Sequence, residues 1–559
     1  MTFWEHFLRL LPKRPWPALA ALYWHLTRRR VRARNRLRAA SADLPFTYRV
    51  WIATAERSAA VAVDYAAEIE RWPYHPKFSV LLHIPDRCSQ EELNRSTDSI
   101  ERQVYPFWDR LIVGTREMLA TQIGAAQGDF VVPLRIGDAL SETALFRFAE
   151  AIQTKKSLLL YGDEDQLERD GSRSRPWFKP QWNAEMFLAQ DYLSSAVALE
   201  TALAREVCAR SGDINLDGLL LAATSVAGAA IVHVPHILCH VGTSSTGSAA
   251  QRLAAVGRHV ERFGATAVSG PFETVKVHWP LPNEMPLVSI IVPTRDKLGL
   301  LRPCIDSVLE RTDYPNFEIL VVDNGSVEKA TADYLGKITR DGRVRVLPYP
   351  DAYNFSAINN FAARDAGGSF LCLLNNDTEV VGSAWLTEMM RQAVRPAVGA
   401  VGAKLLYDDG SIQHAGVVVG IGEAAGHAHR FQRADEPGYF RMPHVAQFVT
   451  AVTAACLVVE KKKFEAVGGL DEEKFAIAFN DVDLCLKLQA SGRRNVYVPH
   501  AVLLHHESKS RGNDLSPPNI DRYRRELDTL QKRWGTKTYK DPLHNPNLDR
   551  YSETFVIRL

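Results

Sequence analysis

Apolar runs that stop at polar residues alternate with helical patterns in the second half of the chain. Most of these runs are continuous stretches of Val, Ile and Leu, which predicts strands buried on both faces of a parallel sheet. Between them, apolar residues recur at helical spacing over 300–309 and 356–366. The predicted strands are 288–292, 317–322, 344–347 and 370–374. This alternation predicts a doubly wound α/β module.

Polar residues directly follow three of these predicted strands. Thr294 and Arg295 follow the first strand, Asp323 the second, and Asn376 and Asp377 the last. Open α/β sheets bind ligands outside the carboxyl ends of their strands, where a carboxylate can hold a divalent cation and, through it, a diphosphate. The last strand end, taken alone, is equally well interpreted as an Asn-rich turn. Three polar strand ends together favour a binding site.

Nine segments between Leu287 and Gly535 carry a resemblance to a known family. They are, in order, SIIVPTRD, YPNFEILVVDNGS, NFSAINNFAARDAGGSFLCLLNNDTEV, IQHAGVV, VTAACLVV, VGGLDE, FNDVDLCLKL, YVPHAVLLHHESKSRG and RWG. In these segments the chain resembles family 2 glycosyltransferases, of the bacterial rhamnosyltransferase-like branch that builds O-antigen and other surface polysaccharides. The resemblance covers nearly half of the chain. It implies a module of the GT-A type, with a mixed, mostly parallel sheet.

The resemblance implies a catalytic base and a metal pair. Asp481 stands where the family carries its base, although Asn480 replaces the Glu that usually precedes it. Asp377 is similar to the metal-contacting acid and His505 to the late metal-side His, with Mg2+ or Mn2+ as the cofactor. Two alternatives stay open. Asn480 or Asp481 could cap a helix, and His506 could take the place of His505, since neighbours on a strand point oppositely.

The other predicted site residues divide between the two substrates. The resemblance assigns to the nucleotide donor Pro293, Thr294, Arg295, Asp323, Asn360, Asn376 and Arg511. It assigns to the acceptor side Gln413, His414, Gly469 and Asp471. A solvated arginine is an equally good interpretation of Arg511, and an ordinary turn is an alternative for Gly469 and Asp471.

Inverting sugar transfer needs a base for the acceptor hydroxyl and positive charge for the departing diphosphate. We therefore expect a metal-dependent inverting glycosyltransferase that uses a dTDP- or UDP-linked sugar. Rhamnose is the family-level expectation, while galactose, glucose and mannose stay open. The expected acceptor is a glycan, or a polyprenyl-diphosphate-linked glycan, in the synthesis of O-antigen or similar lipopolysaccharide. The alternatives are a transferase with two active modules and a non-catalytic glycan-binding scaffold. A sugar-nucleotide pyrophosphorylase is disfavoured, because no glycine-rich loop follows the first strand.

Residues 78–240 repeat the same order of elements with different residues at the strand ends. The segment 126–134 parallels 366–374 without a gap, and Gly114 stands where the second copy has Asp323. Opposite Asn375, Asn376 and Asp377 stand Arg135, Ile136 and Gly137. The sequence thus predicts a degenerate GT-A-like copy, a pseudo-enzyme module kept for packing or acceptor binding.

Three acids and one amide of the first copy could occupy site positions if the alignment were shifted. Asn215 falls near the place of Asp481. A slip of one residue would put Asp138 at the metal position. Asp163 and Asp165 resemble a metal motif but follow a different predicted strand.

Composition bounds the class of protein. The 559 residues suit two domains with extensions, and a net charge of +2 gives no attraction to nucleic acid. Seven cysteines without metal-site spacing indicate a reducing compartment, which we expect to be the cytoplasm. The predicted domains are a basic N-terminal extension (1–45), the degenerate module (46–285), the catalytic module (286–512) and a C-terminal helix and tail (513–559).

The N-terminal extension combines aromatic, apolar and basic residues. Residues 15–26 are apolar but too few to span a membrane, and residues 28–38 contain seven arginines and no acid. This pattern predicts a helix on an anionic membrane surface, peripheral on the inner face of the cytoplasmic membrane. The alternative is a helix packed on the first module with its arginines in solvent.

Overall fold

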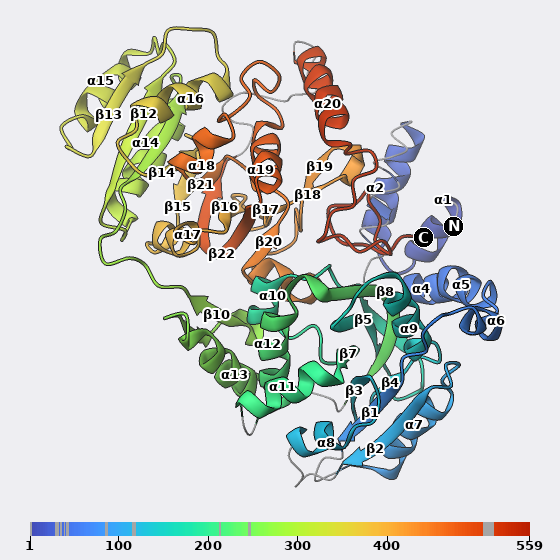
Figure 1. Ribbon diagram of the computed structural model, residues 1–559. Helices are drawn as coiled ribbons and strands as arrows, with labels where there is room; N and C mark the ends of the chain where they lie inside the picture. The colour runs from blue at the N-terminus through green and yellow to red at the C-terminus, as the bar shows by residue number, and fades with distance from the viewer. Residues whose placement is uncertain are drawn as a thin grey trace.

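The computed structural model describes residues 3–27, 33, 36–37, 40, 44–83, 88–113, 119–211, 214–243, 248–506 and 519–559. These residues form two large mixed sheets, one within 78–242 and one within 288–505. The first module lies below the second in Figure 1, and helices flank both sheets. The predicted α/β class is confirmed.

The first module contains an eight-stranded sheet in the order β2-β1-β3-β7-β5-β8-β4, with β6 paired to β5. The strands are β1 (Phe78–His83), β2 (Trp108–Val113), β3 (Phe130–Arg135), β4 (Ala139–Leu140), β5 (Leu159–Leu167), β6 (Arg173–Trp177), β7 (Val197–Glu200) and β8 (Ile231–Gly242). The helices are α7 (Gln90–Glu101), α8 (Leu119–Ala125), α9 (Ala144–Thr154), α10 (Ala184–Ala189), α11 (Thr201–Ser211), α12 (Leu216–Ala227) and α13 (Ala249–Glu261). The short hairpin β9 (Thr266–Ser269) and β10 (Val275–His278) follows and leads toward the second module.

The second module contains a ten-stranded sheet in the order β13-β12-β11-β14-β21-β16-β22-β15, with β17 and β20 paired to β16 and β22. The strands are β11 (Val288–Thr294), β12 (Phe317–Asp323), β13 (Val344–Pro348), β14 (Phe370–Leu374), β15 (Thr378–Val380), β16 (Val398–Leu406), β17 (Ile412–His414), β20 (Gln447–Val449), β21 (Cys456–Glu460) and β22 (Arg494–His505). The α-helices are α14 (Leu298–Arg311), α15 (Lys329–Ile338), α16 (Phe355–Asp365), α17 (Trp385–Ala393), α18 (Lys461–Ala466), α19 (Asn480–Ala490) and α20 (Ile520–Trp534). A separate hairpin consists of β18 (Val417–Val419) and β19 (Ala425–His427).

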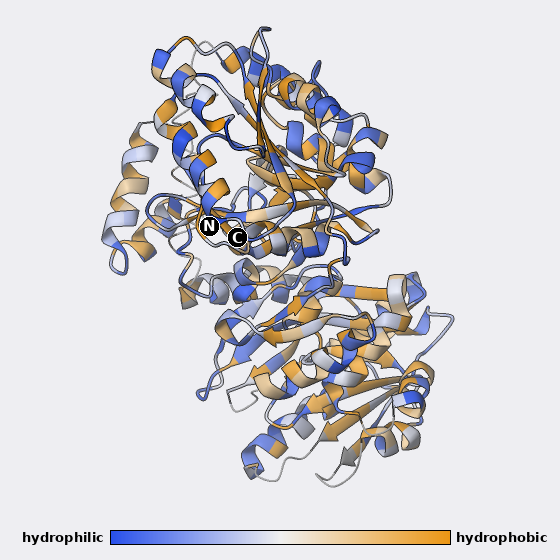
Figure 2. Ribbon diagram, turned by 90° about the vertical axis from the view of Figure 1, so that its left-hand side faces the viewer, coloured by the Kyte–Doolittle hydropathy of each residue, from blue (hydrophilic) through white to orange (hydrophobic). Residues whose placement is uncertain are grey.

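Burial on both faces explains why the central strands are continuous apolar runs. Every residue of β11 and β14 is buried. Ile290 of β11 packs in one core with Ile305 of α14, whereas its neighbour Ile291 packs in the other core with Ile358 of α16. Successive strand residues point to opposite faces, so each layer of helices covers one of these cores. Figure 2 shows the strands of both modules as predominantly apolar.

Within the described ranges, five α-helices with defined bounds precede the first sheet, and a π-helical turn, Ile52–Glu56, joins the third and fourth of them. They are α1 (Phe3–Leu10), α2 (Pro15–Leu26), α4 (Pro45–Trp51), α5 (Arg57–Val61) and α6 (Tyr65–Glu70). None of the helices in the described ranges is long and apolar enough to cross a membrane.

Equivalent contacts align the two modules at the sheet edge. In each module a backbone N–H of the edge strand donates to a serine hydroxyl at 3.1 Å, Leu140 to Ser99 and Val380 to Ser307. Counting back from these strand residues puts Gly137 opposite Asp377, as the gapless alignment predicts. Counting forward from the Val-Pro-His segments of β8 and β22 puts Val241 opposite His505. Asp138 therefore does not take the metal position, and its carboxylate accepts a hydrogen bond from Gly242 N (2.8 Å).

The prediction that Asn215 replaces Asp481 is wrong by two residues. Asn215 is the N-cap of α12, and its side chain accepts a hydrogen bond from Gly218 N (2.9 Å). The equivalent N-cap of α19 is Phe479, and both helices end at or just before a glycine with positive φ. Asp217 therefore stands opposite Asp481. A cap residue and a base are both polar, and the helix start that separates them was not visible in the sequence.

Candidate functional site

The carboxyl ends of β11 and β14 border a cavity of about 140 Å³. Five of the predicted site residues line it, namely Pro293, Asn376, Asp377, Asp481 and His505. They come from β11, from the turn after β14, from α19 and from the end of β22. The tertiary structure thus gathers the predicted metal pair and the predicted base around one cavity.

Asp377 and His505 lie side by side and are almost completely buried. Asp377 Oδ1 lies 3.3 Å from His505 Nε2, and the two side chains are 3% and 7% exposed. The pairing of β15 with β22 produces this proximity, because it puts Thr378 opposite His505. Two donor atoms at this separation can bind the same cation, since bonds from metals to oxygen or nitrogen are about 2.0–2.6 Å long.

The pair fits a divalent cation without completing its coordination. Among the described residues, no group of three or more His, Cys, Asp or Glu side chains could hold a metal ion. Carboxylate oxygen and imidazole nitrogen are both ligands of divalent metals such as Mn2+. A cation bound by Asp377 and His505 would therefore need oxygen atoms from a ligand such as a diphosphate.

The neighbouring His506 points away from this pair. Its Nδ1 forms a short contact with Asp408 Oδ1, and its Nε2 lies 3.9 Å from Glu379. Neighbours on a strand face opposite sides, so only one of the two histidines can face Asp377. The structure assigns that position to His505.

The turn after β14 is joined to the end of β11. The Asn376 amide donates to Thr294 Oγ1 (3.0 Å), and both residues are buried. Thr294 lies opposite Asp323 in the parallel pairing of β11 and β12, and Asp323 accepts a hydrogen bond from Ser326 N (2.9 Å). The Arg295 side chain is exposed just beyond β11. The three polar strand ends predicted from the sequence are therefore neighbours in space.

Asp481 lies in the first turn of α19, on the wall of the cavity. Its carboxylate accepts hydrogen bonds from Ala454 N (3.1 Å) and Val482 N (2.8 Å). Burial nevertheless raises the pKa of Asp481 above the ordinary value of an aspartate, because loss of water outweighs these amide contacts. The residue is not the N-cap of the helix, and neither is Asn480, whose amide donates to Ile477 O (2.8 Å). The environment of Asp481 suits a general base.

The C-terminal helix α20 holds α19 in place. Arg533 and Trp534, at the end of α20, both donate to Asp483 Oδ1 at 2.9 Å. Arg533 also donates to Asp471 Oδ2 (2.8 Å). Asp471 therefore connects the loop before α19 to α20 through Arg533. It does not line the cavity. The RWG segment has a physical role in positioning the helix that carries Asp481.

Asn360 and Gly469 meet each other outside the cavity. The Asn360 amide donates to Leu470 O (2.8 Å), and its Oδ1 accepts from Leu470 N (3.0 Å). Gly469 has a positive φ of 63°, and a Cβ on it would lie 2.7 Å from Asn360 Oδ1. Through these contacts Asn360 fixes the loop that contains Gly469 and Leu470. It does not line the cavity.

Gln413 and His414 are buried residues of β17. His414 is completely buried, and its Nδ1 lies 3.1 Å from Nδ1 of His427. Burial lowers the pKa of His414 well below its ordinary value, which keeps the ring neutral. Neither residue is among those that line the cavity. Arg511, the last predicted donor residue, lies outside the described residues.

Several residues that line the cavity were not predicted from the sequence. They include Tyr353, Phe355 and Thr453. Two signals could have indicated them. Tyr353 immediately precedes the NFSAINNFAARDAGGSFLCLLNNDTEV segment and Phe355 is its second residue, whereas Thr453 is the second residue of the VTAACLVV segment just before β21. Ala454 of that segment supplies the amide that holds Asp481.

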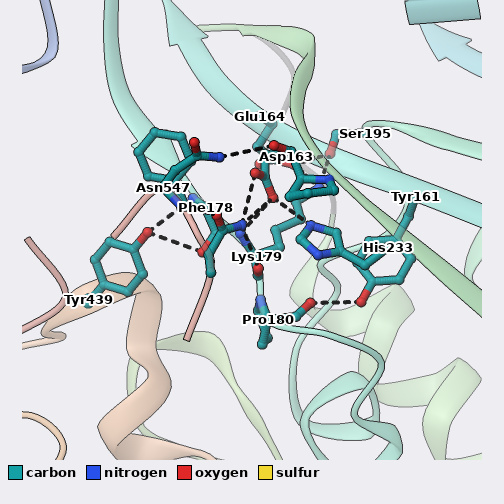
Figure 3. Close-up of polar contacts among 12 residues, drawn as sticks. Tyr161, Asp163, Glu164, Phe178, Lys179, Pro180, Ser195, His233, Tyr439 and Asn547 are labelled. Carbon is teal, nitrogen blue, oxygen red and sulfur yellow. Dashed lines mark hydrogen bonds and ion pairs between the residues drawn. The ribbon is translucent and has the colours of Figure 1, made fainter. Parts of the chain in front are cut away.

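Asp163 and Asp165 of the first module are interior residues. Asp163 Oδ1 accepts from Lys179 N (2.8 Å) and lies 2.8 Å from His233 Nε2, as Figure 3 shows. Asn545, in the tail after α20, donates to Asp163 Oδ2 (2.9 Å). Asp165 contacts His240 and Arg173 in a similar way. These acids connect the C-terminal tail and the strands of the first module, and they form no strand-end metal site.

Residues 289–442 match the family described as Glycosyl transferase family 2. The matched residues lie within the second module. The match contains β14 with the turn that carries Asp377, and it stops before α19. The predicted resemblance is thereby confirmed for the second module, whereas the family match does not extend to the first.

Curated relatives match far more of the chain. An uncharacterized protein, y4gI, of Sinorhizobium fredii is 40% identical over 455 residues, which are 78% of this chain and 50% of that protein. The O-antigen biosynthesis protein RfbC of Myxococcus xanthus is 34% identical over 553 residues, 90% of this chain and 42% of that protein. The chain thus spans about half the length, or less, of these two relatives.

A third relative and one solved structure match shorter parts. N-acetylglucosaminyl-diphospho-decaprenol L-rhamnosyltransferase of Mycobacterium tuberculosis is 29% identical over 226 residues, 35% of this chain and 68% of that protein. A mannosyltransferase of Pyrobaculum calidifontis, solved with GDP-Man and Mn2+, is 17% identical with a TM-score of 0.34. That likeness covers 48% of this chain and 69% of the other.

Proposed function

We propose that the second module is an inverting glycosyltransferase that moves a sugar from a nucleoside diphosphate donor to a glycan or lipid-linked acceptor. The observation that carries this proposal is the common cavity of Asp481, Asp377 and His505. A base of raised pKa on one wall and a carboxylate–imidazole pair on another are what such a transfer requires.

In the proposed mechanism, Asp481 accepts the proton of the acceptor hydroxyl as its oxygen attacks the anomeric carbon. The hydrogen bonds from Ala454 N and Val482 N aim the carboxylate and stabilise its charged form before the reaction. Asp377 and His505 would hold Mg2+ or Mn2+, which supplies positive charge to the departing diphosphate. Thr294, Asn376 and Asp323 line up along the strand ends where the nucleotide would bind.

The names of two relatives support the substrate class. One acts in O-antigen biosynthesis, and the other is named as an L-rhamnosyltransferase on a decaprenyl-diphosphate-linked acceptor. We therefore propose a dTDP- or UDP-linked donor, rhamnose as the first sugar to test, and a polyprenyl-diphosphate-linked acceptor in surface polysaccharide synthesis. The cysteine pattern supports a cytoplasmic location for the reaction.

A panel of nucleotide sugars tests the proposal directly. The whole protein is incubated with each donor, Mn2+ and a short-chain lipid-diphosphate glycan, and products are measured by mass spectrometry. We expect one donor to give a product heavier by one sugar, and the Asp481→Asn variant to give almost none. Absence of any transfer across the panel, by protein that still binds a nucleotide, would favour the glycan-binding scaffold instead.

A further inference from the structure

The helices α1 and α2 form a hairpin with a small core of its own. Phe7 and Leu10 of α1 pack with Ala18 and Ala21 of α2, and Leu37 completes this core. The ring of Phe3 stacks on His25 with centroids 3.9 Å apart. Because the apolar residues of these inner faces are already paired, the outer faces would be expected to be polar in a helix exposed to water.

The outer face of α2 is apolar instead. Trp16, Leu19, Tyr23 and Leu26 follow one another at intervals of three and four residues, which puts them on one side of the helix. Trp16 is 80% exposed and Leu26 is 69% exposed. In the same way, Trp4 and Leu8 stand one turn apart on α1, and both are exposed. We call these six side chains the outer stripe.

The charges around the outer stripe are mostly basic. The helix α2 contains no Asp, Glu, Lys or Arg between Pro15 and Leu26. Lys13 and Arg14 immediately precede it, and in the sequence Arg28 follows it as the first of the seven arginines of residues 28–38. Glu5 of α1 is the single acidic residue in the sequence from 1 to 38. Apolar and aromatic side chains flanked by cations match the interface of an anionic bilayer, where Trp and Tyr are enriched.

The length of α2 decides how it would meet a bilayer. Its 12 residues make a helix about 18 Å long. The hydrocarbon core of a bilayer is about 30 Å thick, so α2 would lie in the interface rather than cross it.

We propose that the outer stripe of α1 and α2 docks the protein on an anionic membrane surface. Trp4, Leu8, Trp16, Leu19, Tyr23 and Leu26 enter the headgroup region, and the exposed Lys13 attracts lipid phosphates. This inference deepens the proposed function, on which it rests for the idea that the acceptor is held in a membrane. The docking itself follows from the exposed side chains and does not depend on catalysis.

Co-sedimentation of the whole protein with lipid vesicles tests the docking. We expect binding to vesicles that contain phosphatidylglycerol, weaker binding to pure phosphatidylcholine, and weakening by salt. The variant Trp16→Ser/Leu19→Ser/Tyr23→Ser/Leu26→Ser should bind at least ~10-fold more weakly, because binding strength scales with the apolar area inserted. The matched control is Val327→Ser/Phe431→Ser, which removes two exposed apolar side chains elsewhere and should bind as the parent does.

The contrary results either contradict the proposed docking or assign the outer stripe to another partner. Equal binding by the four-serine variant and the parent would overturn the proposal, as would no binding of the parent at low salt. If the parent forms a dimer that the four-serine variant does not, and vesicle binding is unchanged, the stripe is an interface between two copies. Unchanged melting and circular dichroism of the variant would show that it still folds.

A water-soluble acceptor separates this inference from the proposed function. Both the parent and the four-serine variant should transfer sugar to a short-chain acceptor at the same rate, whereas transfer to an acceptor in vesicles should fall in the variant. If neither protein transfers sugar in any format, the proposed function fails and the vesicle result still stands. If transfer in vesicles is equal for both, the docking has no part in acceptor access.

Discussion

Each module has its own sheet, and the two sheets have the same strand order but different residues at one edge. Seven strands follow in the same spatial order in both, β2-β1-β3-β7-β5-β8-β4 and β12-β11-β14-β21-β16-β22-β15. Their interior strands are built from the same kinds of apolar residues, and a serine on the first long helix receives the same edge-strand N–H at 3.1 Å. The fold thus depends on buried side chains that both modules retain.

The strand ends of the first module carry different chemistry. Gly137 stands where the second module has Asp377, and Val241 stands where it has His505. Arg135, the last residue of β3, stands in the place of Asn375, and its guanidinium donates to Ser194 Oγ (2.8 Å). An arginine beside a site repels a cation, and Gly and Val offer no metal ligand.

The first module has an acid at the position equivalent to Asp481, but this acid is engaged elsewhere. Asp217, which stands opposite Asp481, forms an ion pair of 2.9 Å with the buried Arg252. Both residues line a cavity of about 970 Å³ that also includes residues of the second module and of the C-terminal tail. The comparison teaches that the order of the strands is the same in both modules, whereas the side chains at one edge of the sheet differ.

The largest expected effect is at Asp481. We predict that Asp481→Asn lowers turnover by about 10²–10⁴-fold with donor affinity nearly unchanged, because an amide cannot take the acceptor proton. Steady-state kinetics and calorimetric titration of the donor measure the two quantities. The matched variant Asp217→Asn should keep the parent's turnover. Turnover of Asp481→Asn within a few-fold of the parent would remove the assignment of the base.

The next effect is at the metal pair. We predict that Asp377→Ala weakens donor binding in the presence of Mn2+ by ~10–100-fold or more, since even partners of metal ligands have effects of that size. A chelator should weaken donor binding of the parent in the same way, because a single carboxylate makes the cation easy to strip. Calorimetry measures both. Donor binding by Asp377→Ala as tight as that of the parent would show that the metal site is misplaced.

The pH dependence of the reaction should report on Asp481. Its raised pKa means that the base takes up a proton at a higher pH than an ordinary aspartate would. As pH falls through this pKa, kcat/KM should drop by up to about tenfold per pH unit, with the midpoint above the usual value of about 3.9. A pH–rate profile checks this, and a flat profile down to that value would contradict it.

The smallest effect is expected in the first module, where a substitution should leave nucleotide binding unchanged. We predict one nucleoside diphosphate site per chain, abolished by Asp323→Ala and Asp377→Ala and unaffected by Asp138→Ala. The carboxylate of Asp138 already accepts a hydrogen bond from Gly242 N inside the fold. Calorimetric stoichiometry measures the number of sites. A second site that survives changes at Asp323 and Asp377 and disappears with Asp138 would make the protein a transferase with two active modules.

The sequence predicted the elements of the second module closely. Continuous apolar runs correspond to β11, β12 and β14, because two-sided burial leaves a pattern that needs no tertiary information. The cavity residues Asp377, His505 and Asp481 could be named from their motifs, although their roles remain to be tested. Asn360 and Asp471 were misplaced relative to the cavity, because a motif does not reveal which side of a loop a side chain occupies.

Two residue assignments required the tertiary structure and could not be made from the sequence. The sequence by itself determined the alternation of strands and helices, the repeat of that order in the first half, and the alignment of Gly137 with Asp377, since each is a local pattern. Only the tertiary structure decided that His505 rather than His506 faces Asp377, and that Asp217 rather than Asn215 matches Asp481. The physical reason is that the phase of β22 depends on its pairing with β15, which lies far away in sequence, and that the start of α12 depends on the hydrogen bond from Gly218 N to the Asn215 side chain.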